Sequence, residues 1–172
     1  MRPKRLGEIL IEHGLLKIEN LKKALEIQKK KGGLIGGVLV ENRLVTEEDV
    51  VVALAEQLNY PYLAVSNFVI NEEAVRAVPA ELAVKYMCIP VDKMSGTLVV
   101  VMSDPSHQGT VRALERASGC RVQAFVGTLS EIEAAIGRCY KKSLKSAHTK
   151  SLGEKLKFVL RQASEERQKL QH

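Results

Sequence analysis

A glycine, an apolar pair and a glutamine occur twice in the N-terminal third of the chain, with the same spacing both times. The matching members, which are separated by one constant offset, are Gly7 and Gly36, Leu21 and Val50, Leu25 and Leu54, and Gln28 and Gln57. A glycine at a helix start lets a ligand approach free N–H groups and the positive end of the helix dipole, which favour an anion. An apolar pair beside an amide offers a planar base a face and a hydrogen-bonding edge. The residue types therefore indicate two half-sites for a ligand with two bases and two phosphates.

Arg5 stands just before Gly7 and adds a guanidinium that can pair with a phosphate or stack on a base. The alternative is structural: duplicated helical hairpins pack on each other, and the glycines are points of close contact. A period of about 30 residues also occurs in repeat arrays, but arrays need about three copies to bury a continuous core. Two copies favour a pseudo-two-fold pair instead.

Each copy is predicted to form two short helices. In the first copy, Gly14 ends the first helix in the left-handed conformation, and the second helix covers about residues 17–30. In the second copy, Thr46 caps the helix that ends near residue 58, and Asp49 completes a capping box.

From residue 61 the pattern changes to mixed α/β. The predicted elements, in order, are an extended segment at 62–70, short helices at 71–78 and 79–86, strands at 88–91 and 97–103, a helix at 106–118, a strand at 120–126 and a helix at 129–140. The first two strands are separated by a short turn and predict a hairpin. The later strand–helix–strand passage predicts a right-handed crossover between parallel strands.

The net charge is concentrated at the C-terminal end. Residues 1–140 contain 17 Lys+Arg and 17 Asp+Glu, so the net charge of +6 lies in residues 141–172. A neutral body argues against nucleic-acid binding, for which a basic globular body is typical. Residues 151–170 are predicted to form an amphipathic helix that packs on the body or on a partner helix. The alternative for this basic segment is a weak contact with an anionic membrane.

The sequence contains no catalytic or metal-binding constellation. There is no P-loop, no metalloprotease histidine pair and no nucleophile elbow. The three cysteines form no close pair, which favours a reducing cytoplasm over a disulfide scaffold or a zinc site. No apolar run approaches the roughly 20 residues of a membrane-spanning helix, and no signal peptide is recognisable. We therefore expect a cytoplasmic, non-enzymatic protein without a cofactor.

Asp104 follows an apolar strand and precedes Pro105, a position that suits two roles. A carboxylate at a strand end can take part in catalysis. The same carboxylate can cap the helix that Pro105 begins, and we favour this second interpretation.

The repeated motif resembles that of a known family. Residues 5–28, RLGEILIEHGLLKIENLKKALEIQ, match the pattern RLGxx(L)(I)xxG(L)(L)xxxxLxxxLxxQ. This is similar to the tandem motif of the MshEN domain, the amino-terminal domain of type II secretion and type IV pilus assembly ATPases. PAELAVKYMCIPV, GTLVVVMSDP and SEIEAAIGRCY extend the resemblance over about residues 4–141. The family's nucleotide-hydrolysing domain has no counterpart in these 172 residues.

In that family some members bind cyclic di-GMP, and others dock the ATPase onto a membrane-platform protein. The resemblance implies a cyclic di-GMP-binding regulatory module of a type II secretion or type IV pilus-type system, with a platform protein or ATPase as partner. The alternative is a nucleotide-independent docking adaptor for a platform component. The implied ligand contacts are Arg5, Leu6, Gly7, Leu10, Leu21, Leu25 and Gln28 in the first copy, Ile35, Gly36, Leu39, Val50, Leu54 and Gln57 in the second, and Asp104.

The two copies are unequal. Leu34 stands where the first copy has Arg5, and Arg43 stands where it has Gly14. We therefore expect the first copy to be the stronger half-site. The expected fold is mixed α+β, with two repeated helical hairpins at residues 1–60 packed on a small α/β subdomain at 61–140. A basic linker and a C-terminal helix are expected at 141–172.

Overall fold

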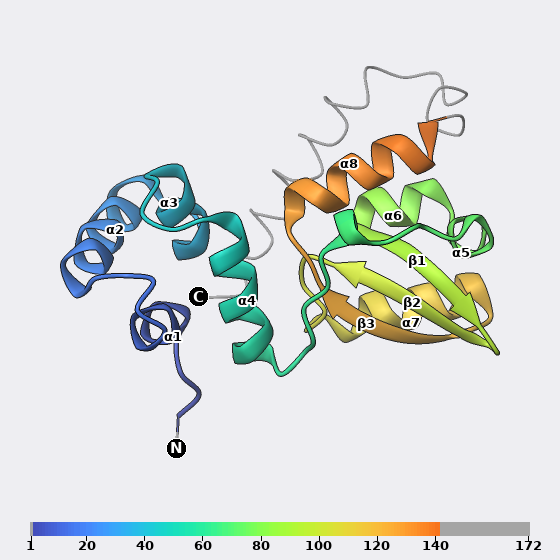
Figure 1. Ribbon diagram of the computed structural model, residues 1–172, viewed down its shortest axis with the longest axis horizontal. Coiled ribbons are helices and arrows are strands. Elements are labelled where there is room, and N and C mark those ends of the chain that lie inside the picture. The colour runs from blue at the N-terminus through green and yellow to red at the C-terminus, as the bar shows by residue number, and fades with distance from the viewer. Residues whose placement is uncertain (1, 142–172) are drawn as a thin grey trace. The chain divides into compact units, whose positions relative to one another are not determined.

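The structure is a computed structural model that describes residues 2–141, and the predicted C-terminal helix lies outside this range. The chain forms two compact units, one that ends at Asn59 and one that begins at Tyr60 (Figure 1). The first unit is helical, and the second combines helices with a three-stranded sheet. The expected mixed α+β class is therefore confirmed.

The helical unit contains two helices from each copy of the repeat. They are α1 (Leu6–Glu12), α2 (Ile18–Lys31), α3 (Ile35–Glu41) and α4 (Glu47–Leu58). The shift that carries Gly7 onto Gly36 also places the start of α1 on that of α3 and the start of α2 on that of α4. The shared core repeats in the same way, because Leu10 and Leu39 are both fully buried, as is Ala24, and Ala53 is nearly so.

A capping box begins α4, as the sequence predicts. The Asp49 N–H donates to the Thr46 hydroxyl at 3.1 Å, and the Thr46 N–H donates to the Asp49 carboxylate at 2.9 Å. These two bonds satisfy amides that have no partner inside the helix.

Left-handed residues end α1 and α3. Gly14 has a φ of 70°, as predicted, and Arg43 has a φ of 54° at the equivalent position. In both copies the next amide donates to the carbonyl five positions earlier, at 2.9 and 3.0 Å. The second copy thus keeps the same helix end with a residue that disfavours this backbone conformation.

Replacing Arg43 with glycine is expected to stabilise the helical unit by roughly 0.5–1 kcal/mol, because glycine tolerates a positive φ. The exposed Arg43 side chain makes no hydrogen bond or ion pair with residues 2–141, so no contact is lost. Urea unfolding measures the effect, with Gly14→Ala as the opposite change at the equivalent position. A variant less stable than the wild type would contradict the assignment.

The second unit is built on a sheet with the strand order β1-β2-β3. Strands β1 (Cys88–Met94) and β2 (Thr97–Met102) are antiparallel, and β2 and β3 (Arg121–Val126) are parallel, as predicted. Ser95 and Gly96 turn the hairpin with positive φ at both residues, 47° and 78°. This combination matches the twist of the strands it joins.

Helices cover both faces of this sheet (Figure 1). Helix α7 (Gln108–Ser118) packs on the face that carries Leu98 and Val100, whereas α6 (Ala80–Tyr86) and α8 (Leu129–Cys139) pack on the face of Val101. The remaining helix, α5 (Glu72–Arg76), also contacts β1. Since both faces are covered, β2 is apolar at consecutive positions rather than at alternate ones.

The segment 62–70 differs from the predicted extended conformation. Its start is extended, where the Leu63 N–H donates to the Val126 carbonyl beside β3, and Phe68 is extended again. A turn of 3-10 helix, η1 (Val65–Asn67), follows. The Glu131 carboxylate of α8 accepts the Ser66 N–H at 3.3 Å, so a partner from a distant part of the chain holds the turn.

The lowered pKa of Glu131 leads us to expect a loss of stability in acid. Burial by itself raises the pKa of Glu131, but hydrogen bonds from Ser66 and Thr128 outweigh it and hold the pKa below its usual value. The stabilisation is therefore present above the unfolded pKa, about 4.3, and is lost as the pH falls through the lower folded pKa. Thermal unfolding of wild type and Glu131→Gln should differ at about pH 6, and the difference should shrink as the pH falls below about 4. A constant difference across this range would contradict the prediction.

Candidate functional site

Gly7 and Gly36 are points of close packing within each copy. A Cβ on Gly7 would lie 2.8 Å from both methyl carbons of Leu21, and a Cβ on Gly36 would lie 2.8 Å from Cγ1 of Val50. Both glycines are buried. The duplicated contact shows the structural role that the sequence left open, because each missing side chain lets the second helix of a copy approach the first.

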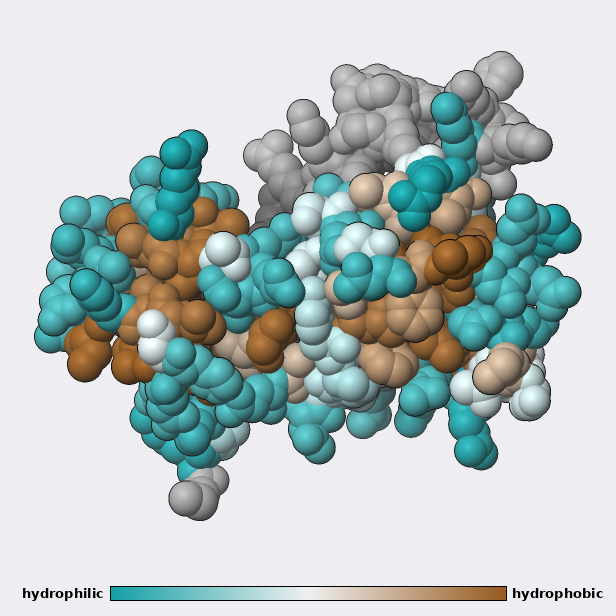
Figure 2. Space-filling model, in the orientation of Figure 1, coloured by the Kyte–Doolittle hydropathy of each residue, from teal (hydrophilic) through white to brown (hydrophobic). Residues whose placement is uncertain are grey.

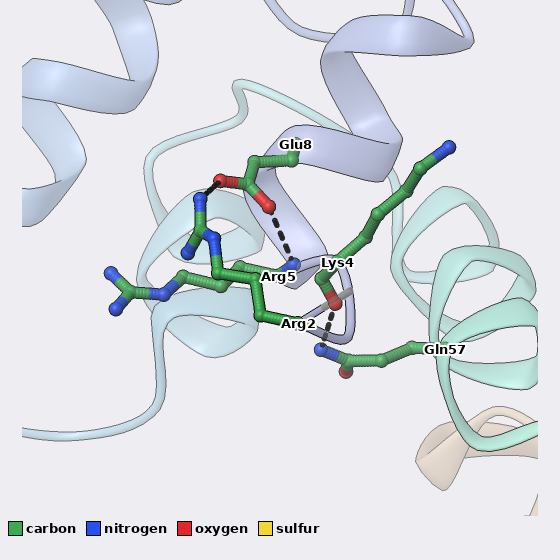
Figure 3. A network of polar contacts seen from close by, with 5 residues as sticks. All are labelled: Arg2, Lys4, Arg5, Glu8 and Gln57. Carbon is green, nitrogen blue, oxygen red and sulfur yellow. Dashed lines mark hydrogen bonds and ion pairs between the residues drawn. The ribbon is translucent and has the colours of Figure 1, made fainter.

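Each of the two glutamines hydrogen-bonds to the residue just before the other copy. The Gln28 amide donates to the Gly33 carbonyl at 2.9 Å, just before the second copy begins. The Gln57 amide donates to the Lys4 carbonyl at 2.9 Å, just before the first copy begins (Figure 3). Lys4 and Gly33 are separated by the same offset as the two glutamines, so one hydrogen bond maps onto the other. The copies therefore form a pseudo-two-fold pair in which α1 contacts α4 and α2 contacts α3.

This exchange changes the composition of the predicted half-sites. The sequence grouped Gln28 with Arg5 and Gly7 of its own copy. In the structure Gln57 lies at the start of α1, and Gln28 lies at the start of α3. Each candidate half-site thus takes its apolar contact from one copy and its amide from the other.

A charged cluster surrounds the start of α1 (Figure 3). The Glu8 carboxylate accepts the Arg5 backbone N–H at 2.9 Å, which lowers the pKa of Glu8, and it also pairs with the Arg2 guanidinium. Lys4 pairs with Glu12 at 2.7 Å, and this hydrogen bond raises the pKa of Lys4. Within residues 2–141 the Arg5 guanidinium has no hydrogen bond or ion pair, and Figure 3 shows it directed away from Glu8. It is therefore available to an anionic ligand.

Burial divides the implied ligand residues into two groups. The core group consists of Leu6, Leu10, Leu39 and Val50, which lie at or below 7% exposure, and of the buried Gly7 and Gly36. The solvent-accessible group consists of Arg5, Leu21, Leu25, Gln28, Ile35, Leu54 and Gln57. Figure 2 shows apolar side chains gathered on the visible face of the helical unit. In this conformation a ligand can reach the second group directly and the first only through it.

Asp104 follows β2 in the α/β unit. Its Oδ1 accepts hydrogen bonds from the Ser106 N–H at 3.0 Å and the Ser106 hydroxyl at 2.5 Å. The carboxylate thus fixes the turn that leads into α7, and His107 stands at the N-cap position. The predicted capping role is therefore wrong, because α7 begins at Gln108 rather than at Pro105 and Asp104 forms a turn before the helix.

The residues that the structure describes hold neither a metal-binding cluster nor a membrane-spanning helix. Within them no group of three or more His, Cys, Asp or Glu side chains is arranged to hold a metal ion. None of the helices from α1 to α8 is long and apolar enough to cross a membrane.

Comparison with known proteins identifies the family. The family model of the MshEN domain matches residues 58–146, about half of the chain. The chain belongs to the MshEN domain family. The motif-based resemblance is therefore confirmed.

Relatives of this MshEN domain include pilus assembly ATPases. The type IV pilus assembly ATPase PilB of Myxococcus xanthus (strain DK1622) is 32% identical over 136 residues, which are 79% of this chain and 24% of PilB. The chain therefore spans about a quarter of that relative's length.

Two solved structures share the fold. They are MshE with cdg, which denotes cyclic di-GMP, and the N-terminal domain of XpsE, with TM-scores of 0.67 and 0.60. Both are 26% identical, and they cover 80% of this chain and 99% and 98% of their own lengths.

Proposed function

We propose that this MshEN domain binds cyclic di-GMP and acts as a non-enzymatic regulatory module of a type II secretion or type IV pilus-type system. The exchanged hydrogen bonds of Gln28 and Gln57 carry the proposal. They relate the two copies by the two-fold symmetry that cyclic di-GMP itself has. The similarity to a structure of MshE with cdg supports the same ligand.

The solvent-accessible residues supply the proposed contacts. Leu21 and Leu25 in one copy, and Ile35 and Leu54 in the other, offer apolar surface on which a guanine can lie. The NH₂ group of each glutamine already donates to a backbone carbonyl. The amide oxygen of each glutamine is the group that accepts a hydrogen bond from a guanine N–H.

A charged residue completes the proposed site. Arg5 pairs with a phosphate or stacks on a base. The buried residues Leu6, Leu10, Leu39 and Val50 hold the helices in place rather than touch the ligand.

The proposed protein partner is the ATPase or a platform component of such a system, as the relatives of this chain suggest. A cytoplasmic location is consistent with the free cysteines, since Cys88, Cys120 and Cys139 form no disulfide.

Isothermal calorimetry of the 172-residue chain with cyclic di-GMP tests the function. A saturable heat is expected with cyclic di-GMP. Cyclic di-AMP is the matched control, because adenine has no N1–H to donate a hydrogen bond to the glutamine oxygen. Absence of heat with cyclic di-GMP at high-micromolar concentration would contradict the proposal, and equal heats with both ligands would contradict the base contacts.

A further inference from the structure

Among residues 2–141, helices cover only part of one sheet face in the α/β unit. On this face α6 and α8 contact β1 and β2 around Val101. Val99 and its partner Gln123 on β3 lie on the same face, because side chains two positions apart in a strand point to the same side. Gln123 is exposed and Val99 is only partly buried. The helix layer therefore stops before the half of the sheet beside the hairpin.

This open half of the sheet offers apolar surface from all three strands. Met94 of β1 is 70% exposed, and Val99 of β2 and Phe125 of β3 are partly exposed. Figure 2 shows apolar side chains gathered over the sheet of this unit. Parallel strands such as β2 and β3 normally have both faces covered by helices. The part of the chain that the structure describes thus leaves room for one more helix in this layer.

The sequence that follows α8 carries a matching apolar stripe. Its members recur at the spacing of one helix face and are Leu152, Leu156, Val159, Leu160 and Ala163. A helix would rise about 16 Å from the first of these residues to the last. The six residues of β2 extend over about 20 Å, so the stripe and the sheet are similar in length.

The end of α8 lies on the correct side of the unit for this contact. Figure 1 shows α8 beginning near the end of β3 and running toward the side where the hairpin turns. The Tyr140 hydroxyl, just after α8, donates to the carbonyls of Val75 and Val78 at 3.1 and 3.0 Å, which fixes this end. Residues 142–150 can reach over about 30 Å when extended, farther than the length of any strand of the sheet. The linker is therefore long enough to bring the stripe onto the open half.

We propose that residues 151–170 form a helix that packs on the open half of the sheet, with the apolar stripe against Met94, Val99 and Phe125. The helix completes the layer that α6 and α8 begin. Burial of the stripe removes apolar surface of both partners from water, which favours the contact. The covalent linker keeps the segment at a high effective concentration near the sheet, so a modest contact area is sufficient.

A single tryptophan tests the contact, because the chain contains none. Gln123→Trp places the probe on the open half, at an exposed strand position that suits an aromatic residue. Ala117→Trp is the matched control on the exposed side of α7, across the sheet. In the full chain without nucleotide, the probe at position 123 should emit at shorter wavelength and be quenched less by acrylamide than the control probe. Equal emission and quenching at the two positions would overturn the proposal.

Variants of the segment identify what covers the probe. Leu156→Asp/Leu160→Asp should abolish the shielding at position 123, because it places two charges in the stripe. Gln162→Asp/Gln168→Asp adds the same charge on the polar side of the segment and should leave the shielding intact. Shielding that survives the leucine variant, or that is lost on dilution as for a contact between two copies, would overturn the proposal.

NMR of the ¹⁵N-labelled chain without tryptophan gives a second readout that does not depend on the probe. The leucine double variant should shift the amide signals of Val99, Gln123 and Phe125, whereas the glutamine double variant should not. Absence of these shifts in the leucine variant would overturn the proposal. Neither measurement involves a nucleotide, so their outcome is independent of the proposed function.

Discussion

Replacing Arg5 with alanine is expected to weaken the binding of cyclic di-GMP by about tenfold to one hundredfold. A hydrogen bond to a charged group contributes roughly 1.5–3 kcal/mol, and about 1.4 kcal/mol corresponds to a factor of ten. Stability should change little, because the Arg5 side chain is exposed and has no hydrogen bond or ion pair with residues 2–141. The backbone N–H that binds Glu8 remains in the variant. Calorimetry measures the affinity, and urea unfolding measures the stability.

Arg76→Ala is the matched control for Arg5→Ala. Arg76 is an exposed arginine of α5 that pairs with Glu72 at 2.9 Å, so its removal changes the net charge equally. Its variant should keep the wild-type affinity within about twofold, since exposed pairs contribute little. If both variants lose affinity equally, the loss is caused by the change in net charge, and Arg5 is not a ligand contact.

The unequal copies provide the reciprocal variant. Leu34 precedes α3 as Arg5 precedes α1, and both residues have an extended backbone, with φ of −84° and −81°. Leu34→Arg therefore restores the missing guanidinium in the same local geometry. We expect it to tighten binding by about tenfold, the value of one charged hydrogen bond at the low end of its range. Weaker binding would show that the second copy does not accept the first copy's chemistry.

Local chemistry made the ends of the elements predictable. The capping box of Thr46 and Asp49, the left-handed Gly14 and the Ser95–Gly96 turn each depend on residues within a few positions of one another. The 3-10 turn at Val65–Asn67 was not predictable, because its acceptor, Glu131, comes from a distant helix.

The site was predictable in its residues but not in its assembly. The Gln28 bond to Gly33 joins near neighbours in the sequence, whereas the equivalent Gln57 bond to Lys4 joins the two ends of the helical unit. The sequence signal that could have revealed the long-range bond is the constant offset between the copies. This offset carries Gln28 onto Gln57 and Lys4 onto Gly33. Spacing also fails to separate Leu10, which is fully buried, from Leu25, which is 40% exposed. Both fit the motif, and only packing shows which faces the core.

Leu39→Ala is expected to destabilise the helical unit by about 2–5 kcal/mol, the usual loss when a buried leucine is truncated and leaves a cavity. Leu39 is fully buried in a core shared by all four helices of this unit. For a small domain each kcal/mol corresponds to about 4–8 °C in Tm, so the midpoint should fall by roughly 8 °C or more. Urea unfolding and thermal scans followed by circular dichroism measure both quantities.

Leu25→Ala is the matched control, because it removes the same atoms from a leucine of the same motif that is 40% exposed. Its stability should stay within about 0.5–1 kcal/mol of the wild type, since it opens no closed cavity. Its affinity for cyclic di-GMP should fall, whereas folded Leu39→Ala should keep near-normal affinity. The two leucines would then separate the roles that the motif combines. Equal destabilisation by both variants would mean that Leu25 belongs to the core, and the division of the motif by burial would be wrong.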